Sequence, residues 1–163
     1  MPEPRDADQR EIEDREAQSR DSGRPRGCTC FRLRRTARQV TRIYDTHLQP
    51  SGLTLTQYSI LTNLARGGPP SVNGMAEMLG MDRTTLTRTL KPLAAAGLLV
   101  LGPGDDRRSK RIALTDHGRS TWELAKPLWR AAQNDLEARL GTAQVAALHQ
   151  LLDDSFAMLA NAT

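Results

Sequence analysis

The chain has 163 residues, which suits one domain with a tail, and its 23 Lys and Arg against 19 Asp and Glu give a net charge of +4. Two cysteines cannot form a disulfide scaffold, no apolar run approaches the roughly 20 residues that span a bilayer, and no signal peptide is visible, so we expect a cytoplasmic protein without a membrane partner. Six aromatic residues are too few for the stacking platforms of single-strand binders, and two cysteines with three histidines leave little material for a metal, cofactor or catalytic centre, so we expect no enzyme.

Residues 1–27 are predicted to be a disordered, charged tail. They hold six Arg and eight acidic residues but almost no large apolar side chain, so they cannot bury enough surface to offset the entropy lost on ordering. The remaining residues, 28–163, carry 17 basic and 11 acidic side chains. The densest basic stretch is Arg83–Arg111, and such a patch indicates a polyanionic partner, most often nucleic acid.

Residues 28–50 are predicted to form a helix, because apolar residues recur at spacings of three and four up to Leu48. A second helix is expected to begin at the capping box Thr54–Gln57 and to end at the turn residues Gly67–Pro70. Both helices should bury one apolar face.

Two short helices are predicted next, joined by a tight turn at Gly80. Ser71 caps the first and Asp82 caps the second, which closes at Gly97 and is expected to kink at Pro92. The turn needs the positive φ that glycine adopts. A small residue, Ala76, lies four positions before Gly80, and a branched apolar residue, Leu86, lies six positions after it. This spacing indicates a helix-turn-helix.

The runs Leu98–Leu101 and Arg111–Leu114 are predicted to pair as a hairpin, since Gly102–Asp106 between them has turn composition. Residues 115–163 are predicted to form two further helices, the first capped by Thr115, with a break at Gly141. Their apolar faces exceed what one small chain can cover, so we expect a second copy to bury them. The predicted fold is mostly α with a small β-hairpin wing, a winged helix-turn-helix.

The outward face of the second helix in this motif is predicted to bind DNA, because such a helix lies in the major groove. Threonines can meet a thymine methyl or donate to phosphate, and Arg88 can reach a guanine edge. The alternative is a solvated polar face, but such faces usually mix both signs of charge and this one holds no carboxylate from position 83 to 91. The predicted DNA-binding residues before the wing are Ser71, Arg83, Thr84, Thr85, Thr87, Arg88 and Lys91.

The tip of the hairpin is predicted to enter the minor groove. Asp106 can hold Arg108 straight for insertion there, and Arg107 and Lys110 are the other predicted DNA contacts of the wing. The alternative is a surface salt bridge of little energetic weight.

Five motifs lie along the ordered part of the chain: Leu53-Thr54-x-x-Gln57, Met81-Asp82-Arg83-Thr84-Thr85-Leu86-Thr87-Arg88-x-Leu90, Ala96-Gly97-Leu98, Asp106-Arg107-Arg108-Ser109 and Leu114-Thr115-x-x-Gly118. Through them the sequence resembles the multiple antibiotic resistance regulator (MarR) family of bacterial transcription factors from about Arg32 to Leu159. The resemblance implies a homodimer, with dimerisation helices at 28–50 and 115–163 around a DNA-binding lobe at 54–114. It also implies a repressor that binds a palindromic operator in double-stranded DNA and is released by a small ligand or an oxidant.

The resemblance further implies a small-molecule effector site between the first, second and fifth helices. Each candidate also has a plainer role: the aromatic residues suit a dimer core, His47 a surface position and Arg38 a solvated face. The candidate ligand-binding residues are Arg38, Tyr44, His47, Tyr58, Trp122 and Trp129.

Cys28 and Cys30 are candidate redox residues. Cys28 lies beside Arg26 and near the start of a helix, which favours a reactive thiol, whereas Cys30 lies on the apolar stripe and is expected to be buried and inert. Side chains two apart on a helix diverge, so an internal disulfide is not expected if both are helical, and two ligands per chain are too few for zinc. The alternatives to a ligand-released repressor are therefore a cysteine-based redox-sensing repressor and a winged-helix module that binds only protein.

Overall fold

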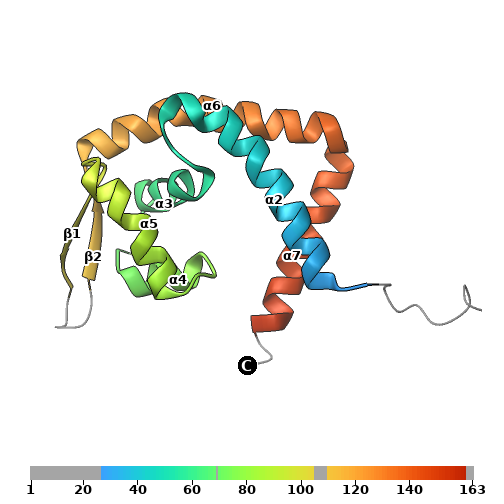
Figure 1. The fold of residues 1–163 in the computed structure, drawn as a ribbon, viewed down its shortest axis with the longest axis horizontal. Helices are drawn as coiled ribbons and strands as arrows, with labels where there is room; N and C mark the ends of the chain where they lie inside the picture. Colours follow the sequence, from blue (N-terminus) through green and yellow to red (C-terminus); the bar gives the residue numbers. More distant parts are fainter. Residues whose placement is uncertain (1–26, 69, 105–109, 161–163) are drawn as a thin grey trace, which may run out of the picture. The chain divides into compact units, whose positions relative to one another are not determined.

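The computed structural model describes residues 27–68, 70–104 and 110–160 and shows helices with one antiparallel hairpin (Figure 1). The chain divides into two units, residues 1–36 and 37–163, and the division falls inside the helix α2 (Thr29–Leu48). None of the helices in the described ranges has the length and apolar character that a membrane span requires. The predicted mostly helical fold with a small hairpin is confirmed.

The helices and strands follow the predicted order. After α2 come a 3-10 turn, η1 (Gln49–Ser51), and the helices α3 (Leu55–Ala65), α4 (Val72–Met78) and α5 (Arg83–Ala95). The strands β1 (Leu99–Pro103) and β2 (Lys110–Leu114) and the helices α6 (Asp116–Leu140) and α7 (Thr142–Ala160) follow. Helix α5 continues through Pro92 for three more residues.

The starts of four helices coincide with the caps predicted from the sequence. At α3 the capping box is complete: the Thr54 hydroxyl accepts the Gln57 amide proton, and the Gln57 side chain accepts the Thr54 amide proton. Ser71, Asp82 and Thr115 cap α4, α5 and α6 in the same way, each accepting the amide proton of the residue three positions later. Short-range hydrogen bonds therefore fix where these helices begin.

The turn between α4 and α5 has the geometry expected of a helix-turn-helix. Gly80 has a φ of +60°, and the Met81 amide donates to the Ala76 carbonyl oxygen at 2.8 Å. Ala76 and Leu86, the small and branched residues on either side of the turn, are both buried. The buried residues at the predicted spacing therefore pack α5 against α4.

The hairpin is confirmed, but its strands are longer than predicted. Pairing reaches Pro103 opposite Lys110, so the first two residues of the predicted turn belong to β1. The start of α4 lies beside the hairpin, since Ser71 forms an isolated antiparallel bridge with Arg111. Helices α3, α4 and α5 gather on one side of α6, and the hairpin lies at the N-terminal end of α6 (Figure 1).

The main hydrophobic core joins α3, α4, α5, the hairpin and the first half of α6. A smaller cluster lies between α2 and α6, around Tyr44, Ala132 and Leu136, and the side chains of Leu55 and Trp129 pack against both clusters. The largest fully buried side chains are Leu48, Ile60, Leu61, Met75, Leu86, Leu90, Leu93, Leu99 and Ile112.

The two terminal helices keep large apolar side chains on the surface of the single chain. On α2, Phe31 and Leu33 are exposed. On α7, Leu152 is 40% and Phe156 62% exposed, and Leu151, Met158 and Leu159 are exposed as well. The apolar stripes predicted for these helices are thus only partly covered by the described residues of the same chain.

Candidate nucleic-acid interface

The structure places the predicted DNA-binding face on the outside of α5. Leu86, Leu90 and Leu93 point into the core and are essentially fully buried, so the residues between them face outward. Among the predicted contacts on this face, Thr87 is half-buried, and Arg83, Thr84, Thr85, Arg88 and Lys91 are exposed.

The N-terminal cap of α5 also orders its first turn. Asp82 accepts two hydrogen bonds from Thr85, one from the amide at 2.8 Å and one from the hydroxyl at 2.6 Å. These hydrogen bonds, led by that of the Thr85 hydroxyl, lower the pKa of Asp82. The carboxylate is therefore ionised at neutral pH and lies at the positive end of the helix dipole, where a negative charge is stabilising.

The other threonines of α5 use their hydroxyls within the helix. Thr87 donates to the Arg83 carbonyl oxygen at 2.7 Å, and Thr89 donates to the Thr85 carbonyl oxygen at 3.0 Å. Thr89 was not among the predicted contacts, yet its side chain lines a depression together with Thr85 and Arg88. The signal that could have found it is its spacing of four from Thr85, which puts the two side chains on one face.

The wing contributes basic side chains beside the start of α4. Lys110 and Arg111 are exposed on β2, and Arg111 bridges to Ser71. The Ser71 hydroxyl accepts the Gly74 amide proton at 3.1 Å, so its capping role is confirmed while its contact with DNA stays a prediction. The predicted wing residues Asp106, Arg107 and Arg108 lie outside the described residues.

Three of the predicted ligand-binding residues come together between α2, α3 and α6. The ring of Trp129 stacks on Tyr58, with 6.1 Å between centroids, and lies 6.2 Å from Tyr44 at a tilt of 38°. The Tyr44 hydroxyl donates to the Gln133 side chain. Burial, with a smaller contribution from the Glu137 carboxylate, raises the pKa of Tyr44. Tyr44 and Tyr58 are buried in the chain's own clusters, which is the plainer of their two roles.

The remaining ligand candidates have other contacts or none of these ring contacts among the described residues. The Trp122 indole N–H donates to the Thr62 hydroxyl at 3.0 Å, and the Lys126 ammonium lies 4.8 Å from the centre of the Trp122 ring. Trp122 thereby fastens α6 to α3. Arg38 is exposed on α2, as a solvated position would be.

His47 belongs to a polar group that joins α2 to α6. Its Nε2 lies 3.3 Å from the carboxylate of Asp135, which also accepts two hydrogen bonds of 2.8 Å from Arg139. The Arg139 guanidinium, followed by His47, lowers the pKa of Asp135. His47 is half-buried and paired, rather than an isolated surface residue.

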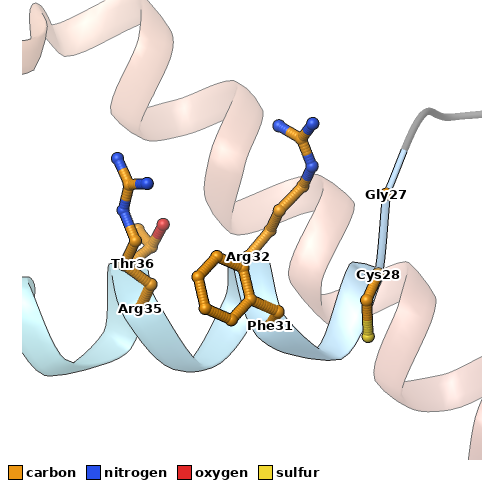
Figure 2. A pocket seen from close by; sticks show the side chains of 6 residues that line it. All are labelled: Gly27, Cys28, Phe31, Arg32, Arg35 and Thr36. Atoms are coloured by element: carbon orange, nitrogen blue, oxygen red, sulfur yellow. The ribbon is translucent and has the colours of Figure 1, made fainter.

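The two cysteines lie at the start of α2. Cys28 lines a pocket with Phe31, Arg32 and Arg35, together with Gly27 and Thr36, and the two guanidinium groups extend to one side of the helix while the thiol points the other way (Figure 2). Both thiols are exposed. The prediction that Cys30 is buried is therefore wrong for the single chain, because none of the described residues covers this thiol. Within the described ranges, no three His, Cys, Asp or Glu side chains could hold a metal ion.

Comparison with known proteins decides the family. A family model described as the MarR family matches residues 51–109, from η1 to the wing. In a crystal structure of the M. tuberculosis transcriptional regulator MosR with DNA, the sequence is 38% identical, the TM-score is 0.66, and the match covers 79% of this chain and 98% of that one. The chain belongs to the MarR family. The predicted resemblance is confirmed.

Two further relatives differ in the ligand or the kind of resistance that their descriptions mention. The transcriptional repressor CouR bound to a 23-mer DNA duplex is 29% identical with a TM-score of 0.69, and the match covers 82% of this chain and 98% of that one. CouR bound to p-coumaroyl-CoA is 27% identical with a TM-score of 0.69, and the match covers 77% of this chain and 89% of that one. The organic hydroperoxide resistance transcriptional regulator of Bacillus subtilis is 34% identical over 90 residues, which are 55% of this chain. The chain spans 61–66% of the length of the first curated relatives that it matches.

Proposed function

We propose that this MarR-family chain is a transcriptional regulator that binds double-stranded DNA sequence-specifically through α5. The observation that carries this proposal is the outward face of α5, where Arg88 and Lys91 are exposed and no carboxylate occurs between positions 83 and 91. A basic face on the second helix of a helix-turn-helix suits phosphate contacts from the lysine and base-edge contacts from the arginine. The same charge argues against a module that binds only protein. The DNA-bound relatives support the assignment.

The functional unit we propose is a homodimer on a palindromic operator. The exposed apolar side chains of α2 and α7, among them Leu152 and Phe156, are the surface that a second copy would bury. A two-fold dimer places its two recognition helices in successive major grooves, about 10 base pairs apart. Each wing would follow into the adjacent minor groove, where Arg108 is the predicted inserted side chain and Asp106 its brace.

We further propose that a small aromatic acid or phenol releases this repressor from DNA. The group formed by Tyr44, Tyr58 and Trp129 offers ring faces between α2, α3 and α6, with Gln133 as a polar neighbour. A ligand that separates these helices would change how α6 holds the DNA-binding lobe. The p-coumaroyl-CoA complex of CouR supports this class of effector.

Selection from a random duplex library by the full-length protein tests the DNA-binding proposal. We expect the enriched duplexes to share an inverted repeat with half-sites about one helical turn apart. The Arg88→Ala variant should lose that enrichment, whereas Arg130→Ala, which removes an exposed arginine from α6, should keep it. If neither wild type nor control enriches any duplex, the protein-binding alternative is favoured instead.

The exposed thiols favour a second candidate function, a repressor that senses peroxides. Cys28 precedes the first helical residue, so the divergence of helical side chains does not separate it from Cys30. A peroxide would take two electrons: the Cys28 thiolate attacks one peroxide oxygen, the O–O bond breaks, an alcohol or water leaves, and the sulfenic acid condenses with the Cys30 thiol to a disulfide and water. The name of the hydroperoxide-resistance relative supports this reading.

The two effector candidates separate in a single DNA-release assay. If the aromatic effector governs release, peroxide leaves both wild type and Cys28→Ser on the operator, while an aromatic carboxylate or phenol releases both. If the thiols govern release, peroxide frees the wild type and leaves Cys28→Ser bound. The second result would replace the first proposal.

A further inference from the structure

We infer that the depression on α5 is a seat for the 5-methyl group of a thymine that lies next to the guanine contacted by Arg88. The inference rests on the proposed DNA-binding function and names the base step that it reads. The depression is lined by Thr85 and Arg88, which are exposed, and by Thr89, which is half-buried beside them on the same side of the helix.

The hydroxyl protons of both threonines are already used inside the helix. A threonine hydroxyl has one proton to donate. Thr85 gives its proton to Asp82 at 2.6 Å, and Thr89 gives its proton to the Thr85 carbonyl oxygen at 3.0 Å. Donation to a phosphate or to a base acceptor would require breaking one of these hydrogen bonds. What each side chain still offers to DNA is its methyl group, together with the lone pairs of its oxygen.

A methyl group has one natural counterpart in the major groove. Thymine alone presents an apolar group there, and contact with a threonine methyl is an established way to read it. Two threonines four positions apart on a helix put their side chains side by side, so they can enclose one base methyl where one threonine could only touch it. The Asp82 bond restricts the rotation of Thr85, so the seat is formed before DNA binds.

Arg88 fixes which base pair is the neighbour. Its exposed guanidinium is part of the same depression, and an arginine in the major groove pairs best with the O6 and N7 atoms of guanine. The half-site should therefore contain a thymine and a guanine on adjacent base pairs.

The test is a scan of single uracil substitutions through the duplex selected by the full-length protein, with Kd measured for each. Uracil differs from thymine at this edge only by the missing methyl. We expect one thymine per half-site to be sensitive. Its replacement by uracil should raise Kd by about fourfold for each half-site substituted, because one methyl group is no longer buried. The remaining thymines should tolerate the change.

Matched variants assign that sensitivity to the threonines. Thr89→Ser and Thr85→Ser keep the hydroxyl and remove the methyl, so they should weaken binding to the thymine duplex and show little further loss on uracil. Thr89→Val keeps the methyl and removes the oxygen, so it should retain both affinity and uracil sensitivity. Thr46→Ser is the control: this threonine is exposed on α2, away from the DNA-binding face, and its hydroxyl also donates to the carbonyl four positions earlier, so the variant should leave both affinity and the uracil penalty unchanged.

The outcomes separate this inference from the function on which it rests. Selective DNA binding without any uracil-sensitive thymine would overturn the methyl seat and leave the proposed function standing. Weakened binding in Thr89→Val together with wild-type binding in Thr89→Ser would show that the hydroxyl oxygen makes the contact, which also overturns it. A uracil penalty that persists in both serine variants would assign the thymine to another residue. Absence of any selective binding would overturn both proposals.

Discussion

Replacing Gly118 with alanine should destabilise the protein more than any other glycine-to-alanine change in α6 or the hairpin, because α6 crosses the base of the wing at this residue. A Cβ there would overlap the Leu98 carbonyl oxygen and lie 2.8 Å from both the Leu98 carbonyl carbon and the Leu114 Cδ1 atom. The Leu98 oxygen also accepts the Thr115 amide proton at 3.2 Å. The backbone, rather than a flexible side-chain end, would have to move.

The magnitude follows from these contacts. Overpacking a buried site costs about 1–3 kcal/mol, and losing the Thr115 hydrogen bond adds about 1 kcal/mol, so we expect Gly118→Ala to lower the free energy of unfolding by about 2–4 kcal/mol. For a domain of this size the expected fall in Tm is roughly 10 °C. Thermal unfolding followed by circular dichroism, at one fixed protein concentration, measures it.

Gly102 provides the matched control. It lies in β1, its backbone has no positive φ, and no atom lies within 4 Å of a Cβ built there. Gly102→Ala should therefore change the free energy of unfolding by no more than about 0.5 kcal/mol. If Gly118→Ala unfolds at the wild-type temperature, the close approach of α6 to the wing is not a constraint and the reasoning fails.

Four further predictions follow from the site and the interface. Asp82→Asn should lower Tm by a few degrees at pH 7, and because the pKa of Asp82 is depressed in the folded state, the difference from wild type should shrink as the pH falls below about 4. Arg88→Ala should weaken binding to the selected operator by about 1–3 kcal/mol and relax the preference at one base pair per half-site. Lys91→Ala should weaken binding to all sequences alike and lower the slope of log affinity against log salt concentration by about one per half-site. Identical behaviour of the two variants would refute the idea that Arg88 reads a base and Lys91 contacts phosphate. Leu152→Asp should yield unfolded chain, and a folded 18.0 kDa species in sedimentation would argue against the dimer. Asp106→Ala should weaken operator binding although it removes a negative charge, and tighter binding at low salt would show that Asp106 is no brace for the wing.

Sequence alone could predict the features that depend on neighbouring residues. The caps at Thr54, Asp82 and Thr115 are confirmed because an N-cap is a hydrogen bond over three residues, and the side chain, the amide and the backbone angle are all local. Gly80 is confirmed for the same reason, since the positive φ of one residue makes the turn. The buried stripe of α5 is confirmed because its period matches the helix.

Features that depend on residues far apart in the chain could not be predicted from the sequence. The stripe containing Cys30 showed which face was apolar but not whether the same chain covers it, and in the single chain it is exposed. Turn propensity marked Pro103 as a loop residue, whereas pairing across the hairpin makes it strand. The hydroxyl partners of Thr85 and Thr89 depend on side-chain rotamers, so the sequence left open whether these threonines offer a donor or a methyl group to DNA.

The central claim, that the face of α5 reads a duplex, is tested most directly by comparing the Kd of the selected operator with that of a scrambled duplex across a range of salt concentrations. We predict that the wild-type protein binds the operator at least about 1,000-fold more tightly at physiological salt, that both affinities fall steeply as salt rises, and that Arg88→Ala loses most of the preference while keeping salt-dependent binding. Equal affinity for operator and scrambled duplex, or a preference that survives in Arg88→Ala, would contradict the account.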